Sequence, residues 1–442
     1  MQFNSIHFIF FFLPIFLTIY YVLPVKWRNP LLLVGSVLFY WINARQAPFA
    51  LTLLILLLTA YAYFMGIIIQ RRRHPVIFWS SLVFLVGLMV FFKAFSGGVL
   101  LPVGFSYYMF QISAYLIAVY RKKMDPEEDP IALGCQIIMF PKILIGPIAE
   151  PVLLQRETSG RKHEVMTFHE GLQLFIVGLA MQVLLGNRIH GLWYQASVVG
   201  YESISVLYAW LALLGFTMNL YFNFYGCSLM AKGIGLMMGF HLPDNFDTPY
   251  ASRSVAEFYR RWHISLGAWF RENVYIPMGG NRGGTVRTIL NLLVVWILTG
   301  LWHGVGGNYL LWAGILVFFI IIERLWLRKW LEKHRIISHI YTVLVILLSW
   351  VPFAIGDWGQ MLTFYGRLIG IGGKAINPVD YMGQIQMYGE LILAGVVMAT
   401  PLPKWIFHKI RKYWIADVLL FVLFWVVVYF IATSAQDPFT YY

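Results

Sequence analysis

Residues 286–327 read VRTILNLLVVWILTGLWHGVGGNYLLWAGILVFFIIIERLWL. Two apolar arms flank a short run that contains Gly304, Gly306 and Gly307, and glycine disfavours the helix interior. In the first arm His303 lies 16 residues after Arg287, a rise of roughly 24 Å, somewhat less than the ~30 Å hydrocarbon core of a bilayer. The stretch therefore predicts a glycine-broken helical hairpin over 286–327 that carries His303 within or near the outer part of the membrane.

The rest of the chain has the same character. Of its 442 residues, 60% are hydrophobic and 12% charged, whereas soluble domains carry about 25% charged residues. Further apolar runs fall near 6–23, 30–43, 48–70, 75–96, 100–120, 131–150, 168–187, 204–224, 337–355, 387–403 and 415–434. Because 131–150 contains Pro141, Gly146 and Pro147, we expect it to be re-entrant rather than spanning. The predicted fold is a single all-α polytopic membrane domain over 1–442, with about eleven transmembrane helices plus re-entrant and interfacial helices.

The charge pattern predicts how the chain lies in the membrane. The net charge is +13, and the basic residues cluster in short loops between apolar runs. This is typical of cytoplasmic loops that meet anionic membrane lipids, and it argues against nucleic acid as a partner. Counting the crossings places both termini outside the cytoplasm. The two cysteines, Cys135 and Cys227, lie far apart in apolar surroundings and indicate neither a disulfide framework nor a metal site.

A second segment, SVAEFYRRWHISLGAWFREN at 254–273, has aromatic and aliphatic residues at helical spacing. Polar residues flank this stripe, among them Arg260, Arg261 and Arg271, with His263 at its edge. The pattern predicts one amphipathic helix in the cytoplasmic interface. It is either a lipid-facing helix whose arginines reach headgroups, or the floor of an active site with the arginines near an anionic donor.

His303 is the strongest candidate for chemistry. An ionisable side chain at membrane depth is costly, and short glycine-interrupted segments are where membrane proteins tend to place substrate sites. With an ordinary pKa of ~6.5, a histidine suits general-base work. The alternative is a structural histidine bonded to a neighbouring carbonyl. Two lesser candidates are Asn223, an intramembrane polar group, and the GGNRGG turn at 279–284, which could hold phosphate or be a simple turn.

The two histidine segments resemble the signature of the membrane-bound O-acyltransferases. FYRRWHISLGAWFRENVYIPMGGNR at 258–282 and LTGLWHG at 298–304 are the most specific parts. The runs at 101–121, 140–148 and 228–250 and the C-terminal DPFTYY are also similar to the branch of the alginate O-acetylation protein AlgI, and more distantly to the D-alanyl transferase DltB. The resemblance covers nearly the whole chain.

The resemblance implies a helix bundle around a central funnel or tunnel, in a bacterial cytoplasmic membrane. It implies a thioester donor from the cytoplasm, acetyl-CoA or a carrier-bound acyl group, and no tightly bound cofactor. The near-invariant family histidine falls on His303 and the second on His263. The implied acceptor is an extracytoplasmic polysaccharide, alginate- or cellulose-like or peptidoglycan. An esterase-like extracytoplasmic protein and a cytoplasmic acyl carrier protein are the candidate partners.

The chain departs from the family pattern at three places. Asn223 and Leu229 stand where the family usually has aspartate, and 180–186 reads AMQVLLG where relatives often carry lysine. A changed acceptor or partner, or a weakened enzyme, would each fit these replacements.

We therefore predict an O-acetyltransferase with His303 as general base and His263 assisting by polarising the thioester or positioning the donor. The remaining candidates for lining the cavity or binding the donor are Trp262, Trp302, Arg260, Arg261, Arg271, Asn223, Asn308, Asn281 and Arg282. The alternatives are D-alanyl transfer to teichoic acid and a transporter that moves a lipid-linked or anionic substrate.

Overall fold

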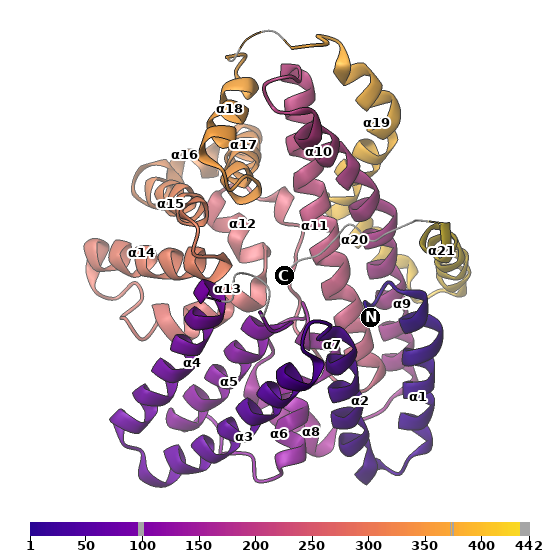
Figure 1. Cartoon of the computed structure of the whole chain (residues 1–442), viewed down its shortest axis with the longest axis vertical. Coiled ribbons are helices and arrows are strands. Elements are labelled where there is room, and N and C mark those ends of the chain that lie inside the picture. The colour runs from indigo at the N-terminus through magenta and orange to yellow at the C-terminus, as the bar shows by residue number, and fades with distance from the viewer. Residues whose placement is uncertain (96–100, 372, 374, 434–442) are drawn as a thin grey trace. The chain divides into compact units, whose positions relative to one another are not determined.

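The computed structural model describes residues 1–95, 101–371, 373 and 375–433. These residues are mostly helical, and the isolated bridge between Phe246 and Trp262 is the one β pairing among them. The prediction of an all-α polytopic membrane protein is confirmed (Figure 1). The DPFTYY motif, and with it the predicted side of the C-terminus, lies outside the described residues.

In the described part of the chain, eight helical segments are long and apolar enough to cross a membrane: Pro48–Arg72, Pro75–Ala94, Val165–Val199, Val206–Met237, Gly284–His303, Gly307–Lys333, Arg335–Ala354 and Trp414–Thr433. A bent pair, Asp380–Met398 with Pro401–Ile410, would make a ninth. Two further predicted spans form helices of 16 residues, α2 (Arg28–Asn43) and α5 (Phe105–Tyr120), which rise only about 24 Å each. The count of about eleven therefore stays a prediction.

The chain forms two compact units, one of Met1–Leu179 with Cys227–Asp244 and one of Ala180–Gly226 with the described part of Asn245–Thr440. Each unit is described by itself. The expected single domain and its central funnel therefore stay predictions. The helices of the first unit are η1 (Phe8–Phe12), α1 (Leu13–Val22), η2 (Val25–Trp27), α2, α3 (Pro48–Arg72), α4 (Pro75–Phe95), α5, α6 (Pro130–Ile138), α7 (Phe140–Ile143), α8 (Pro151–Gly160) and most of α9 (Val165–Ala180).

The segment predicted to be re-entrant forms the buried centre of the first unit. Its helices α6 and α7 have nine and four residues, too few to span a bilayer. The chain breaks at Met139, and the Ser36 hydroxyl accepts the Phe140 N–H at 3.0 Å. The fully buried Phe140 ring packs against the ring of Phe16 at 5.1 Å. The Ser36 hydroxyl thus gives the Phe140 N–H the acceptor that it loses at the helix break, and aromatic packing holds the break in place.

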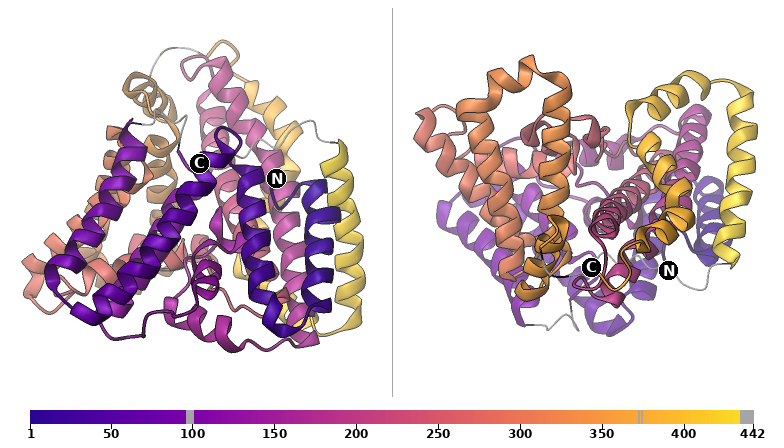
Figure 2. Two further views of the ribbon diagram at one scale, coloured as in Figure 1. Left: turned by 60° about the horizontal axis from the view of Figure 1, so that its bottom comes forward. Right: turned by 90° about the horizontal axis from the view of Figure 1, so that it is seen from above.

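The second unit contains the remaining helices: η3 (Met181–Asn187), α10 (Arg188–Val199), the first part of α11 (Val206–Met237), η4 (Pro249–Ala251), α12 (Val255–Arg261), α13 (Ile264–Phe270), η5 (Arg271–Tyr275), α14 (Gly284–His303), α15 (Gly307–Ile322), η6 (Glu323–Leu327), α16 (Arg328–Lys333), α17 (Arg335–Ala354), α18 (Trp358–Leu368), α19 (Asp380–Met398), α20 (Pro401–Ile410) and α21 (Trp414–Thr433). Within it α15 packs against both α14 and α17 (Figure 2).

One predicted span is wrong in detail. The run 387–403 is not one helix, because α19 ends at Met398 and α20 leaves it at 69°. Pro401 has no N–H to continue the helix, and the Thr400 hydroxyl accepts the Leu402 N–H at 3.3 Å to begin the next one.

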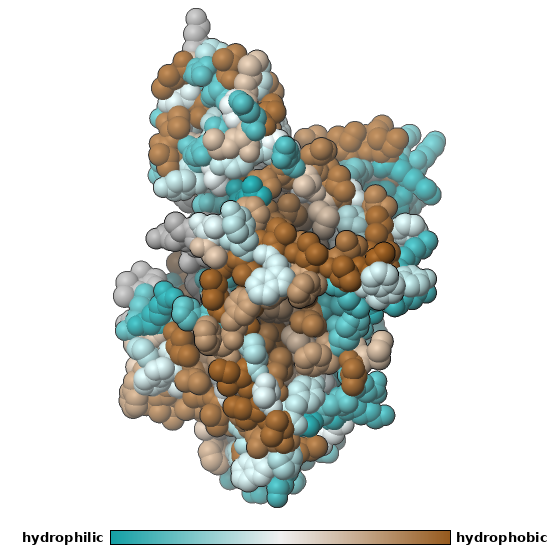
Figure 3. Space-filling view, turned by 90° about the vertical axis from the view of Figure 1, so that its right-hand side faces the viewer, coloured by the Kyte–Doolittle hydropathy of each residue, from teal (hydrophilic) through white to brown (hydrophobic). Residues whose placement is uncertain are grey.

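The last described helix, α21, shows the membrane character most directly. It exposes large apolar side chains over its whole length: Trp414, Ile415, Val418, Leu419, Phe421, Val422, Trp425, Val426 and Tyr429. Figure 3 looks at the side on which α21 lies and shows hydrophobic side chains covering much of it. A helix with an exposed apolar surface of this kind is suited to lipid rather than to water.

Candidate active site

His303 is the last residue of α14, directly before the glycine break. The break is short because α15 returns close to α14. A Cβ on Gly300 would lie 3.0 Å from the Tyr309 carbonyl oxygen, so a larger side chain would push the arms apart. A Cβ on Gly304 would lie 2.5 Å from the Tyr309 ring, which stacks on His303 at 6.3 Å. These two glycines therefore hold the histidine against the opposite arm.

Aromatic rings surround the His303 imidazole. Trp312 of α15 and Phe353 of α17 meet it edge to face with ring centroids 4.9 and 5.0 Å away, and Trp302 lies 4.3 Å away. Trp312 is 2% exposed, whereas His303 is only half-buried. The imidazole thus has rigid apolar walls and keeps accessible surface of its own, as a reacting group requires.

A proline in α17 helps to form this wall. Pro352 has no N–H for the carbonyl of Leu348, and the Tyr365 hydroxyl donates to that oxygen at 2.9 Å. The carbonyl of Pro352 itself accepts Nδ2 of Asn308 at 3.0 Å. Asn308, predicted to line the cavity, is therefore occupied in tying α15 to the end of α17, beside Phe353.

The segment predicted as one amphipathic helix over 254–273 is two short helices, α12 and α13, followed by the turn η5. The break falls on His263, whose backbone is left-handed with φ 47° and ψ 52°. Such a conformation costs roughly 1–2 kcal/mol for a residue other than glycine. Asn245 holds it in place: its carbonyl accepts the Ile264 N–H at 3.0 Å, and its Oδ1 accepts the N–H and hydroxyl of Ser265. A distant segment thus breaks the helix, whereas the location of this segment in the interface stays a prediction.

The His263 side chain is buried, with 5% of its surface exposed. Its ring meets Phe224 at 4.8 Å and Trp302 at 6.0 Å. Burial lowers the pKa of His263 to about 3, so the imidazole is neutral at physiological pH. Through Trp302, the break between α12 and α13 contacts the break between α14 and α15.

Glu323 is a site residue that the sequence did not single out. It is 4% exposed, and its two carboxylate oxygens accept the N–H groups of Val255 at 2.6 Å and Ala256 at 3.1 Å. The Ser254 hydroxyl accepts the next N–H, that of Glu257. The free donors of the first turn of α12 are therefore satisfied, and the end of α15 is tied to α12. The sequence did not single out Trp312 and Phe353 either, because only folding brings their rings to His303.

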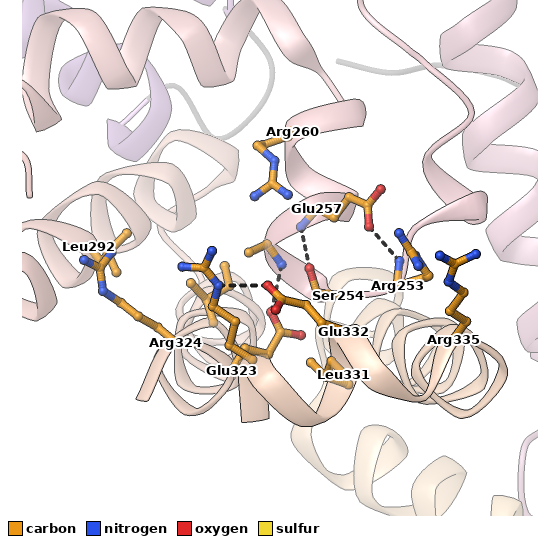
Figure 4. Close-up of a pocket in the computed structure, with 13 residues that line it drawn as sticks. Arg253, Ser254, Glu257, Arg260, Leu292, Glu323, Arg324, Leu331, Glu332 and Arg335 are labelled. Carbon is orange, nitrogen blue, oxygen red and sulfur yellow. Dashed lines mark hydrogen bonds and ion pairs between the residues drawn. The ribbon is translucent and has the colours of Figure 1, made fainter. Parts of the chain in front are cut away.

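A pocket of about 850 Å³ opens beside this capped helix end (Figure 4). Its charged lining comes from five arginines and three glutamates: Arg253, Arg260, Arg324, Arg328, Arg335, Glu257, Glu323 and Glu332. Glu332 pairs with Arg328, and Glu257 pairs with Arg261 outside the lining. No ion pair to a described residue is made by the other four arginines. The pocket is therefore positively charged, and Arg260 points into it from α12.

The other predicted donor-binding residues lie differently. Arg261 forms ion pairs within the protein, with Glu257 at 2.9 Å and Asp247 at 3.9 Å. Asn281 accepts from Arg324 at 3.1 Å, next to the pocket. Arg271 and Arg282 are exposed and not part of the pocket lining.

The GGNRGG run forms a hydrogen-bonded turn. The N–H groups of Gly279, Gly280 and Arg282 all donate to backbone carbonyls. A phosphate cradle would need such groups free, so the geometry favours the plain turn.

The remaining candidates form two further groups. Trp262 packs on Trp350 with ring centroids 5.3 Å apart. Asn223 is fully buried, donates Nδ2 to the Asn219 carbonyl, and lies so close to Gly186 that a Cβ there would be 2.7 Å from the amide. Two of the departures noted in the sequence, Asn223 and the 180–186 stretch, are therefore neighbours in space. The third, Leu229, is a buried apolar residue of α11.

Comparison with known proteins assigns the class. The model of MBOAT, the membrane-bound O-acyltransferase family, matches residues 171–351, which include both histidine segments. The chain belongs to this family, and it is an O-acyltransferase. Family membership favours the enzyme over the transporter interpretation.

Particular relatives narrow the comparison. A protein of Pseudomonas putida named "Probable alginate O-acetylase AlgI" is 34% identical over 86% of this chain and 82% of its own length. The peptidoglycan O-acetyltransferase of Helicobacter pylori is 26% identical over 90% of this chain and 86% of its own. The teichoic acid D-alanyltransferase of Bacillus subtilis is 25% identical over 52% of this chain and 62% of its own.

Proposed function

We propose that this O-acyltransferase takes an acetyl group from a cytoplasmic thioester, acetyl-CoA or a carrier-bound acyl group, and passes it across the membrane for O-acetylation of an extracytoplasmic polysaccharide. The observation that carries the proposal is His303: a half-buried imidazole with aromatic walls at the break between two membrane-crossing arms. The names of the two relatives matched over most of their lengths, an alginate O-acetylase and a peptidoglycan O-acetyltransferase, support acetyl as the group.

In the proposed reaction His303 is the general base. One ring nitrogen accepts the proton of the attacking hydroxyl, whose oxygen forms a bond to the thioester carbon. The carbon–sulfur bond then breaks, and the proton passes from the imidazolium to the departing sulfur, so that histidine is regenerated. In this scheme His263 is a positioning residue: its imidazole is neutral, packs on Trp302 and does not act as a cation on the thioester.

The arginine-lined pocket is our candidate for the phosphate-bearing end of the donor. Guanidinium groups suit phosphate because they offer several N–H donors in one plane. An acyl carrier protein in the cytoplasm, and an esterase-like protein that places the group on the polymer outside, are the proposed partners. The cytoplasmic membrane of a bacterium is the proposed location.

The test is His303→Gln in purified full-length protein, with His408→Gln on the exposed face of α20 as the matched control. Loss of a general base costs about 100-fold or more in rate, so acceptor-dependent release of CoA from acetyl-CoA should fall by that factor in the first variant only. Unchanged turnover in His303→Gln would remove the proposed role of this residue.

The second candidate reaction is D-alanyl transfer, because the chain is also similar to a teichoic acid D-alanyltransferase. Mass spectrometry of surface glycans from a deletion strain distinguishes the two, because either O-acetyl or D-alanyl esters are lost. We expect the O-acetyl esters to disappear and to return with the wild-type protein.

A further inference from the structure

A second pocket of the same unit lies where α10, the start of α11 and the start of α19 meet. Its volume is about 360 Å³, near the lower end of the range for small-molecule sites. The residues on which the argument rests are Tyr194, Tyr208, Ile376, Asp380 and Gln384.

The pocket is held by a buried arginine. Arg367, 3% exposed and near the end of α18, donates to the carbonyls of Tyr201, Glu202 and Gly373. The Ile376 N–H donates to the Ser203 carbonyl at 3.0 Å, which joins the two chain segments that border the pocket. The lining is thus built into the fold.

Three polar atoms of the lining are buried without a hydrogen-bond partner among the described residues. They are the Tyr208 hydroxyl, Oδ1 of Asp380 and Oε1 of Gln384. The whole Tyr208 side chain is 2% exposed, and the other carboxylate oxygen of Asp380 accepts the Ser205 N–H at 3.0 Å. Buried polar atoms without partners are costly, so this part of the pocket is suited to a ligand that supplies both hydrogen-bond donors and acceptors. Ordered water is the simpler occupant, but a pocket of this volume has room for far more than one.

The chemistry of the lining narrows the ligand. Oδ1 of Asp380 and Oε1 of Gln384 accept hydrogen bonds, and the Tyr208 hydroxyl can donate one. The exposed Tyr194 ring in the same lining offers an apolar face. A sugar presents hydroxyls and C–H faces together. The lining residues include a carboxylate and no lysine or arginine to neutralise an acidic ligand. The Asp380 carboxylate would repel the carboxylate of a uronate bound in the same pocket.

We infer that this pocket binds an uncharged, hydroxyl-rich saccharide segment, and that the acceptor polymer of the proposed acetyl transfer is therefore a neutral glycan rather than a polyuronate. This inference rests on the proposed function for its biological meaning but not for the binding itself.

The test measures binding of cellopentaose and of a mannuronate pentamer to full-length protein in detergent, without any thioester. Wild type should bind cellopentaose saturably and the acidic pentamer at least tenfold more weakly. Tyr208→Phe and Asp380→Asn should each weaken cellopentaose binding about tenfold, the effect of one lost hydrogen bond in a buried site. Asp380→Asn should also reduce the difference in affinity between cellopentaose and the acidic pentamer, because it removes the repelling carboxylate. A merely structural role of Asp380 would leave that difference unchanged.

Asp357→Asn is the matched control, because it removes one carboxylate from the same unit at a position outside the pocket lining. Equal binding of both oligosaccharides, or no saturable binding of cellopentaose, would overturn the inference. His303→Gln should bind like wild type. A failed binding experiment therefore leaves acetyl transfer standing, and an inactive enzyme that still binds cellopentaose would count against the proposed function alone.

Discussion

The rings of His263 and Trp302 meet at 67° with centroids 6.0 Å apart, and the same indole lies 4.3 Å from His303. Two histidines from separate helix breaks therefore contact one tryptophan, which is itself 6% exposed. A change in the indole should alter both imidazoles, and this dependence can be tested.

Trp302→Ala should lower acetyl transfer at least tenfold, because the ring that packs on both histidines is removed. The cavity should also destabilise the protein by about 3–5 kcal/mol. Trp302→Phe keeps an aromatic ring and should retain most activity. Turnover and thermal unfolding in detergent measure the two effects. Trp425→Ala on the lipid-facing surface of α21 is the control, and an equal loss there would show that the effect is not specific to the histidine contact.

The low pKa of His263 predicts an acid-sensitive fold. Burial lowers that pKa to about 3, whereas the unfolded chain has the ordinary value of about 6.5. Between these values the unfolded state binds more protons, so the contribution of His263 is complete above pH 6.5 and is lost as the pH falls toward 3. Thermal unfolding should therefore become easier over this range.

His263→Asn should reduce the slope of unfolding temperature against pH, since asparagine does not titrate and accepts the left-handed backbone. His163, whose pKa burial lowers to about 4, contributes with the same sign and leaves a residual slope. Equal slopes in wild type and variant would mean that the His263 imidazole is not buried and neutral in the folded protein.

The two histidine segments differ in how much of their structure follows from local sequence. The break after His303 was predicted at its glycines, because glycine disfavours the helix whatever packs against it. The break at His263 was missed, because an apolar stripe at helical spacing runs through it and the residue that stabilises the left-handed backbone is Asn245, eighteen positions earlier. The arginine-lined pocket could not be predicted either, since Arg253 and Arg335 meet only in the folded chain (Figure 4).

Glu323→Gln should destabilise the second unit by about 1–3 kcal/mol, because the carboxylate accepts two backbone N–H groups and the amide offers a single oxygen. Trypsin should then cut faster after Arg253 and Arg260 as α12 loosens. Glu332→Gln removes only an exposed ion pair and should cost less than about 1 kcal/mol. Equal protection from trypsin in both variants would exclude a capping role for Glu323.

The arginine-lined pocket predicts how the donor binds. In the proposed donor site, guanidinium groups of this pocket bind phosphate away from the reacting carbonyl. In the double variant Arg260→Gln/Arg335→Gln the KM for acetyl-CoA should therefore rise about tenfold with kcat nearly unchanged. Added salt should raise the wild-type KM more than that of the variant, since the lost interaction is between charges.

The variant Arg282→Gln distinguishes binding of acetyl-CoA in the pocket from a general attraction of acetyl-CoA to the positively charged protein. Arg282 is exposed and outside the lining, so its loss lowers the net charge without touching the pocket. Its KM for acetyl-CoA should stay within about twofold of wild type. If the KM rises as much in Arg282→Gln as in the double variant, the donor responds to the overall positive charge of this surface. A fall in kcat without a change in KM in the double variant would instead mean that these arginines support the fold of α12 and not the donor.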